Sequence, residues 1–335
     1  MRLFISIASY CDPVLPFTLE RAVATASAPG SLHFGVVDQS PAARPRLTMR
    51  GAARLSQVHL DNRDARGPCW ARAIAMSLYD GEDWFLQLDS HMDFAPGWDE
   101  RLVTQARAMR GGRNGALTTY PSAFAFEDGK PVPKPITTKV LACVVKPGEG
   151  FAGIDPVLKF EAQAVETDET LPGFHVGAGC LFASGNFALE IPYDPSFYFH
   201  GEEQGVALRL YTRGWDVFHP PGMPIYHLYT DRPTGMAARP MHWDEAEDAR
   251  RQVKWRELEQ RSRARLAQLV SGQPLGAYGV GNERSVADFA KFSGVDYENR
   301  KVAAHAYRPQ PVRSAGFRAS ISLATTTQHS GKWSG

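Results

Sequence analysis

Short apolar runs that end in polar residues recur along the first 230 positions of the chain. Branched and aromatic side chains dominate these runs, and turn-forming or charged residues follow each one, which is typical of buried strands. The runs that we predict as strands are Leu3–Ala8, Leu32–Val37, Leu55–Leu60, Trp84–Leu88, Ala116–Tyr120, Trp215–Phe218 and Ile225–Tyr229.

Apolar residues at helical spacing separate several of these strands. The alternation of strand and helix predicts an α/β fold with a mostly parallel sheet flanked by helices. In such a sheet the polar residues that follow the strands meet at one edge. The predicted helices are Pro16–Ala26, Trp70–Leu78, Trp98–Arg110 and one that runs through Val206 and Tyr211 and ends at Gly214.

Two later regions depart from this pattern. Prolines interrupt residues 121–171, so we expect long surface loops there, with room for a hairpin, that shape a substrate groove. Residues 244–269 are charged and helix-prone with few apolar positions, which predicts a surface or appended helix, and a short helix is predicted at 286–292. The predicted organisation is a main domain at 1–230, a helical C-terminal extension at 231–307 and a flexible tail at 308–335.

Composition narrows the classes of protein that fit. Hydrophobic residues make up 43% of the 335, which is enough for a core, and the formal net charge is only +1. This charge gives no field that attracts nucleic acid or an anionic membrane, and no run reaches the about 18 apolar residues of a transmembrane segment. The cysteines Cys11, Cys69, Cys143 and Cys180 lack CxxC spacing, so we expect reduced thiols and a cytoplasmic protein.

Ionisable residues gather where predicted strands end. Asp89 and His91 follow the fourth predicted strand, and one intervening residue places their side chains on the same side of an extended backbone. Glu202 and Glu203 open a predicted helix, and His227 lies on a late strand. Carboxylate oxygens suit Mg²⁺ or Mn²⁺, and imidazole nitrogens shift the preference towards Mn²⁺. The pattern indicates a metal-assisted site at the sheet edge.

A phosphate site is indicated beside these residues. Arg66 and Arg72 lie near the start of a predicted helix, where backbone amides, the helix dipole and guanidinium groups favour an anion. Each candidate alone also has an ordinary explanation as a solvated arginine, a turn cap, a helix-dipole partner or a core histidine. The glycines at His175–Gly185 could let the backbone approach a ligand, but their spacing is not GxGxxG and excludes a dinucleotide motif.

Five short motifs occur in a fixed order along the chain. They are Ser6-Ile7-Ala8-Ser9-Tyr10 with Asp12-Pro13, Gly67-Pro68-Cys69-Trp70-Ala71-Arg72, Gln87-Leu88-Asp89-Ser90-His91-Met92, His200-Gly201-Glu202-Glu203 and Tyr226-His227-Leu228-Tyr229. In this combination the sequence resembles a family of N-acetylglucosaminyltransferases that includes the enzyme acting on hydroxyproline of a cytoplasmic ubiquitin-ligase adaptor. The resemblance implies a GT-A glycosyltransferase, with a Rossmann-like sheet that binds a nucleotide-sugar and a divalent cation.

The resemblance implies which residues bind the metal. Asp89-Ser90-His91 takes the place of the family's DxD-type motif, with Asp89 and His91 at the cation and the diphosphate. His227 matches the late metal-binding histidine of GT-A enzymes. The implied cation is Mn²⁺ or Mg²⁺. Asp93 adds a carboxylate two residues beyond His91, and its role stays open.

The resemblance also implies residues for the donor and the chemistry. Glu202 or Glu203 matches the acidic residue that contacts the acceptor or the donor sugar, and the choice between them stays open. The implied nucleoside residues are Ser9, Tyr10, Asp12 and Asp38, and the implied diphosphate residues are Arg72 with Arg66 nearby, Asp89 and Ser90.

The implied function is a metal-dependent transfer of a sugar, GlcNAc from UDP-GlcNAc, to a hydroxyl group with retention of the anomeric configuration. Hydroxyproline on a protein and a glycan are both candidate acceptors, because residues 121–171 carry no motif that identifies the acceptor. Two alternatives stay open: a nucleotide-sugar-binding module without catalysis, and a metal-dependent phosphoester hydrolase.

Overall fold

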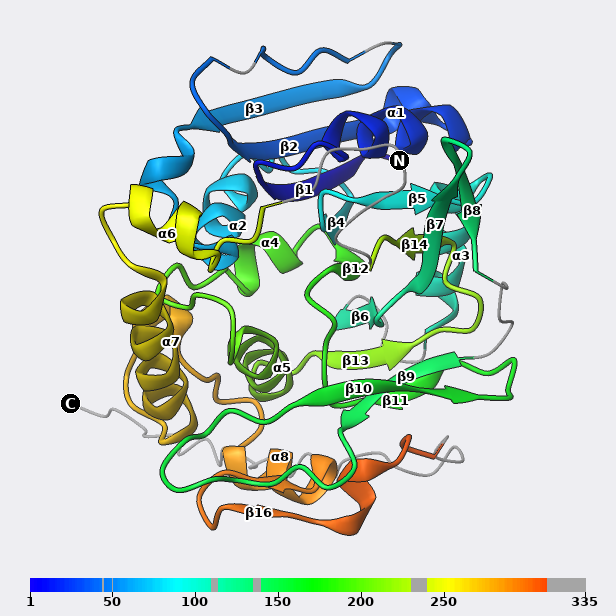
Figure 1. Ribbon diagram of the computed structural model, residues 1–335. Coiled ribbons are helices and arrows are strands. Elements are labelled where there is room, and N and C mark those ends of the chain that lie inside the picture. Colours follow the sequence, from blue (N-terminus) through cyan, green and yellow to red (C-terminus); the bar gives the residue numbers. More distant parts are fainter. Residues whose placement is uncertain (44, 50, 110–113, 135–139, 230–239, 312–335) are drawn as a thin grey trace, which may run out of the picture.

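An eight-stranded sheet forms the centre of the computed structural model (Figure 1). In spatial order its strands are β11 (Leu171–Gly173), β13 (Asp216–His219), β6 (Gly115–Thr118), β12 (Cys180–Ser184), β4 (Trp84–Leu88), β1 (Leu3–Tyr10), β2 (Leu32–Gln39) and β3 (Arg54–Leu60). The structure describes residues 1–43, 45–49, 51–109, 114–134, 140–229 and 240–311. Most of the predicted tail therefore lies outside the described residues.

Parallel pairing dominates this sheet. β1 is parallel to β2 and β4, β2 is parallel to β3, and β6 is parallel to β13. β12 is antiparallel to both β4 and β6, and β11 is antiparallel to β13. All the strands except β11 and β12 therefore point in one direction and bring their carboxyl ends to one edge. The predicted mostly parallel α/β sheet is confirmed.

Helices cover both faces of the large sheet (Figure 1). Side chains alternate between the two faces, so Leu3 and Ile5 of β1 join one core cluster while Phe4 joins the other. Among the described residues, no helix has the length and apolar character needed to cross a membrane. The first face packs against α1 (Leu15–Thr25) and α3 (Trp98–Ala108), and the second against α2 (Pro68–Met76), α4 (Phe187–Glu190) and α5 (Glu202–Thr212).

The region predicted as long loops contains strands instead. Two antiparallel hairpins form there, and the segment then enters the large sheet as β11. Pro131 and Pro133 fit because β8 is an edge strand, where a missing amide donor costs little. A second sheet has the order β5 (Met92–Phe94), β14 (Ile225–His227), β7 (Ser122–Glu127) and β8 (Lys130–Pro133), and the other hairpin is β9 (Val140–Val145) with β10 (Phe160–Val165).

The charged C-terminal region forms two helices rather than the predicted single one. Lys254 Nζ donates hydrogen bonds to backbone carbonyls at the end of the first helix, and the buried Arg251 side chain turns inward at the break. Leu266 and Leu269 of the second helix belong to the same core as α5, so this helix is not only a surface element. The remaining elements are α6 (Glu245–Arg250), α7 (Trp255–Val270), α8 (Val286–Ser293), β15 (Val295–Asp296), β16 (Lys301–Val302) and the 3₁₀ turns Pro29–Ser31, Asn62–Asp64, Gly276–Tyr278 and Ala304–Tyr307.

Candidate functional site

The carboxyl edge of β4 carries the residues on which the site is built. β4 ends at Leu88, so Asp89 and His91 follow directly at the sheet edge. β14 runs antiparallel to β5 with His227 opposite Met92, and the Leu228 N–H donates to the His91 carbonyl at 3.1 Å. His227, which is far from Asp89 in the sequence, is thereby held beside the carboxyl end of β4.

Asp89, His91 and His227 form a compact group of possible metal ligands. One ligand atom from each residue lies within 4.8 Å of the other two. The Nε2 atoms of the two histidines are 3.0 Å apart, and His227 Nε2 lies 3.2 Å from Asp89 Oδ2. Neighbouring ligands of an octahedral ion with bonds of about 2.1 Å are separated by about 3 Å. The spacing therefore fits a cation of the size of Mg²⁺ or Mn²⁺.

Asp12 orients one of these ligands. Its Oδ2 lies 2.8 Å from His91 Nδ1 and accepts a hydrogen bond from Ser90 Oγ at 2.6 Å. A carboxylate that accepts the Nδ1 proton leaves the Nε2 lone pair of His91 directed at the other ligands, as in many metal sites. Burial raises the pKa of Asp12, but the contacts with His91 and Ser90 outweigh it and leave the pKa below its usual value. The donor set and its support fit a divalent cation.

Arg72 connects the metal-ligand group to α5. This buried side chain donates from Nη2 to Asp89 Oδ1 at 2.7 Å and from Nη1 to Glu202 Oε1. Burial raises the pKa of Asp89, but the His227 hydrogen bond and the Arg72 charge lower it well below its usual value. Asp89 thus stays ionised, with one oxygen toward Arg72 and the other toward His227.

The adjacent glutamates lie in different surroundings. Glu202 is enclosed, with a side chain that is only 4% exposed, and it accepts hydrogen bonds from Arg72 and the Tyr193 hydroxyl. Burial raises the pKa of Glu202 more than Arg72 and Tyr193 lower it. The Glu203 side chain is 29% exposed and points to a separate set of hydrogen-bond donors. Of the two glutamates, Glu203 therefore has the more accessible side chain.

The predicted nucleoside residues lie at the ends of β1 and β2. Ser9 and Asp38 are buried, and β1 and β2 extend two residues further than predicted because Ser9 and Tyr10 pair with Asp38 and Gln39. The Tyr10 hydroxyl donates to Glu247 Oε2 at 2.8 Å. The predicted region therefore contacts α6, which the sequence pattern did not connect to it.

Two predicted residues lie apart from the central network. Arg66 is exposed, and its guanidinium lies over the Trp70 ring with 5.7 Å to the ring centroid. Asp93 is buried and accepts a hydrogen bond from Arg21 Nε at 2.6 Å, so its carboxylate faces α1. The Asp93 carboxylate thus forms an ion pair with a residue of α1.

Several residues of the site carried no recognisable signal in the sequence. Tyr193 lies in a loop, and Gln87 on β4 donates to its hydroxyl at 3.0 Å. His175 and Tyr120 contact Glu203 from two other segments. Gly179 was noted only as one of several glycines, and a Cβ there would lie 2.5 Å from Asp89 Oδ2. Because Gly179 has no side chain, the Asp89 carboxylate can lie close to the backbone at this position.

Comparison with known proteins agrees with the fold. Residues 40–299 match the family described as Glycosyltransferase (GlcNAc). The structure of GalNAc-T7 with UDP, GalNAc and Mn²⁺ superposes with a TM-score of 0.51 at 14% identity, covering 87% of this chain and 54% of that one. This chain thus spans about half the length of that protein.

A second similar structure is TarS 1–349 from S. aureus in complex with UDP-GlcNAc, with a TM-score of 0.39, 12% identity and coverage of 83% of this chain and 75% of that one. No curated protein matches the sequence. The family match covers more than half of the chain. The chain therefore belongs to the GlcNAc glycosyltransferase family, and its α/β architecture is that of a GT-A sugar transferase.

Proposed function

We propose that this protein is a divalent-cation-dependent glycosyltransferase that moves GlcNAc from UDP-GlcNAc to a hydroxyl acceptor. The observation that carries the proposal is the group of Asp89, His91 and His227 at the carboxyl edge of the sheet, supported by Asp12 and Arg72. The family description names GlcNAc, and the GalNAc-T7 structure contains UDP and Mn²⁺. A nucleotide-sugar with its cation suits this edge of an α/β sheet.

The proposed metal ligands are Asp89, His91 and His227. A site with one carboxylate and two imidazoles favours Mn²⁺ over Mg²⁺, since magnesium prefers an all-oxygen shell. When bound, the cation would offset the negative charge that grows on the leaving diphosphate. The diphosphate would complete the coordination shell, so we expect tighter metal binding with UDP present than without it.

We assign Arg72 and Glu202 the role of holding the proposed metal ligand Asp89 in place. Sugar transfer breaks the bond between the anomeric carbon and a phosphate oxygen, so ionised groups around the phosphates must stay in fixed places. Arg72 keeps Asp89 ionised and oriented, and it stands near the expected diphosphate. Glu202 holds Arg72 from the other side with help from Tyr193. We therefore assign Glu202 a role through Arg72 rather than through direct contact with the substrate.

The nucleoside is assigned to the ends of β1 and β2, at Ser9, Tyr10 and Asp38, with Asp12 and Ser90 supporting the metal ligands. Ser9 Oγ and Gln39 Oε1 are buried and have no hydrogen-bond partner within the described part of the chain. Both atoms are fully covered, so the assignment of the nucleoside rests on the position of these strand ends at the carboxyl edge of the sheet. The more exposed Arg66 is assigned to the outer phosphate region.

The assigned residues all fall within 1–230, which we propose as the catalytic domain, and residues of α7 and α8 complete the core around α5. The acceptor is proposed to be a hydroxyl group on protein hydroxyproline or a glycan, and transfer is proposed to retain the anomeric configuration. Analysis of the product by NMR would give the configuration, and mass spectrometry after transfer from a labelled donor would identify the acceptor.

A donor-turnover assay tests the proposed function. The protein would be incubated with Mn²⁺ and either UDP-GlcNAc, UDP-GalNAc or UDP-glucose, and UDP release would be measured with and without EDTA. We expect Mn²⁺-dependent release with UDP-GlcNAc as the best donor. Tight UDP binding without any turnover would favour a binding module, whereas phosphate release from simple phosphoesters would favour a hydrolase.

A further inference from the structure

Two aromatic side chains are exposed together on the surface between α5 and α6. Phe199 is 44% exposed and Trp243 is 40% exposed, and their rings meet edge to face with 5.2 Å between the centroids. Phe199 precedes α5 and Trp243 precedes α6, so two segments far apart in the sequence form one aromatic surface. Exposed apolar side chains that gather in this way mark binding surfaces more often than isolated ones do.

Buried residues hold the two rings in place. Tyr198 and His242, which directly precede the exposed rings in the sequence, are both buried, and the Tyr198 hydroxyl lies 2.6 Å from His242 Nδ1. The His242 ring also packs edge to face against the Tyr10 ring, with 4.9 Å between the centroids. Rings on such a fixed backbone lose little conformational freedom when a ligand binds.

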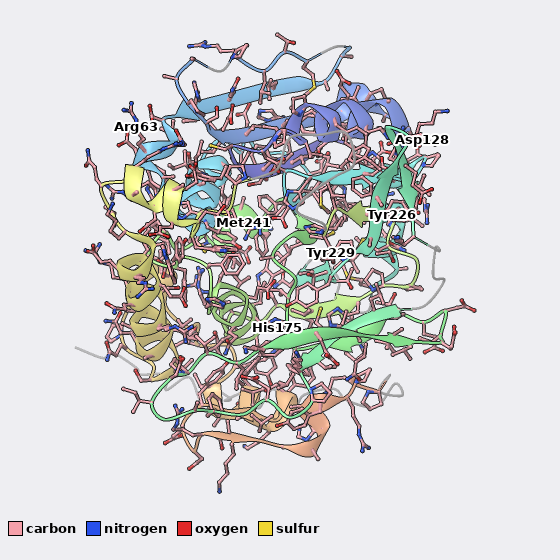
Figure 2. All side chains as sticks on the ribbon, in the orientation of Figure 1. Arg63, Asp128, His175, Tyr226, Tyr229 and Met241 are labelled. Carbon is pink, nitrogen blue, oxygen red and sulfur yellow. The ribbon has the colours of Figure 1, made fainter. Side chains whose placement is uncertain are left out.

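Both segments that carry the exposed rings continue into the proposed donor site. The Phe199 carbonyl accepts a hydrogen bond from the Glu202 N–H at 3.5 Å, where α5 begins. On the other side, the contact between His242 and Tyr10 reaches the end of β1, to which the nucleoside is assigned. Figure 2 shows Met241, which belongs to the same segment as the second ring, on the side of α6 toward the centre of the view. The aromatic surface is thus a neighbour of the proposed site.

Polar groups border the aromatic surface. The His200 side chain is 52% exposed, and its ring lies beside the Phe199 ring with 5.3 Å between the centroids. His200 Nδ1 lies 2.8 Å from Glu259 Oε1, and the exposed imidazole has a second ring nitrogen that can form a hydrogen bond with a ligand. The surface therefore combines apolar ring faces with a hydrogen-bonding group.

This combination matches a chain of sugar rings. One face of a pyranose ring carries mostly C–H groups, which pack on an aromatic ring, while the hydroxyls at its rim form hydrogen bonds with polar side chains. A stable protein–protein interface buries about 800 Å² on each partner, so two exposed rings suit a sugar chain better than a protein surface. The other exposed large apolar side chains of the described residues lie in other segments, at Met1, Ile154, Leu189 and Tyr229.

We propose that Phe199 and Trp243 bind the sugar chain of a glycan acceptor, on sugar units other than the one that receives the transferred GlcNAc. The proposal rests on the proposed function, and it selects a glycan over protein hydroxyproline as the class of acceptor. The two rings hold the acceptor and take no part in the chemistry.

Binding of defined oligosaccharides tests this inference. Saturation-transfer NMR and calorimetry would measure the affinities of chitohexaose, cellohexaose and maltohexaose, with and without UDP and Mn²⁺. We expect at least one of them to bind to the native protein, and Trp243→Ala and Phe199→Leu to weaken its binding by about fivefold or more. The affinity for UDP in Mn²⁺ should stay within about twofold in both variants, because neither ring is assigned to the donor.

Two control variants separate ring stacking from general effects. Phe199→Tyr keeps an aromatic ring and should keep the native affinity for the oligosaccharide, whereas Phe199→Leu keeps only an apolar side chain. Leu189→Ala removes an apolar side chain that is 71% exposed in another segment, and it should leave the oligosaccharide affinity unchanged.

The outcomes that contradict the inference are distinct from those that contradict the proposed function. Absence of binding to all three oligosaccharides would overturn the inference, and so would an equal loss of oligosaccharide and UDP affinity in Trp243→Ala, which would show a structural role. Binding of a hydroxyproline peptide in place of the oligosaccharides, lost in the same variants, would assign the surface to a protein acceptor. Failure of the native protein to bind UDP with Mn²⁺ would instead reject the proposed function.

Discussion

Asp89 serves two partners at once, with one carboxylate oxygen toward Arg72 and the other toward His227. This division explains how a single residue after a strand can be both ionised and available to a metal. It also separates Asp89 from Asp93, which lies nearby in the sequence and is paired with Arg21. Two aspartates four residues apart thus have different partners, because the backbone directs Asp89 toward Arg72 and His227 and Asp93 toward α1.

We predict that Asp89→Asn lowers sugar-transfer activity by at least about 100-fold, because it removes one metal ligand and the charge that Arg72 faces. Mn²⁺-dependent UDP binding should be lost in the same variant. Circular dichroism and thermal unfolding would check that the variant is folded. Retained Mn²⁺-dependent UDP affinity in a folded protein would contradict the assignment.

Asp93→Asn should give the opposite pattern. The change removes an ion pair between the buried Asp93 and the partly exposed Arg21, so we expect a lower free energy of unfolding, by about 1–2 kcal/mol, with little effect on the Mn²⁺ dependence of UDP binding. Chemical denaturation and the same UDP titration would measure both quantities. A selective loss of Mn²⁺ dependence would instead identify Asp93 as a metal ligand.

At the scale of elements, α5 is the support of both glutamates. The helix begins at Glu202 directly after Gly201, whose φ of 87° lies in the left-handed region that favours glycine. Leu266 of α7 packs beside Gly201, and a Cβ on that glycine would lie 3.1 Å from Leu266 Cδ2. The start of α5, and therefore the site, depends on a helix from the C-terminal region.

Leu266→Ala should lower the free energy of unfolding by about 2–5 kcal/mol, since the side chain is fully buried in the core that α5 and α7 share. Leu189→Ala is the matched control because Leu189 is 71% exposed, and its effect should stay within about 0.5 kcal/mol. Urea denaturation of both variants would test this. Equal effects would mean that α7 does not stabilise the core that it shares with α5.

The sequence predicted most elements of the large sheet because each has a strong local pattern. β1, β2, β4 and α1 lie close to their predicted positions. The hairpins in residues 121–171 were largely missed, since prolines at an edge strand resemble loop signals. At the break between α6 and α7, the Arg251 side chain contacts the hydroxyl of Tyr10, which is distant in the sequence, and the carbonyl of the nearby His242.

The candidate site was predictable only in part for the same reason. Asp89, His91 and His227 belong to motifs that a sequence displays, and the fold brings them together. Tyr120, His175 and Tyr193 contact the site residues from other segments of the chain, and no local spacing marks them. The metal-binding role of Asp89, His91 and His227 remains a prediction that the experiments above address.

At the scale of the whole molecule, two buried histidines are expected to make the fold less stable at acidic pH. Burial lowers the pKa of His219 to about 4, and burial with the Arg251 charge lowers that of His242 to about 3. An unfolded chain with ordinary histidine pKa values near 6.5 binds protons more readily below that pH. Stability should therefore fall as the pH drops from about 6.5 towards 4.

For each of these two histidines, we expect the free energy of unfolding to fall by about 2 kcal/mol between pH 7 and pH 5. In His219→Gln the slope of stability against pH should become shallower, whatever the stability at pH 7. His305→Gln is a surface control, because His305 is exposed, and should keep the native slope. An unchanged slope in His219→Gln would show that His219 is not the source of acid sensitivity.

The most direct test of the account is a calorimetric titration of UDP into the protein in Mn²⁺ and again in EDTA, with His227→Ala as the variant. The account predicts that UDP binds in Mn²⁺, that EDTA abolishes most of this affinity, and that His227→Ala binds weakly under both conditions. Equal UDP affinity with and without the metal would contradict the central claim that Asp89, His91 and His227 hold a cation for the donor.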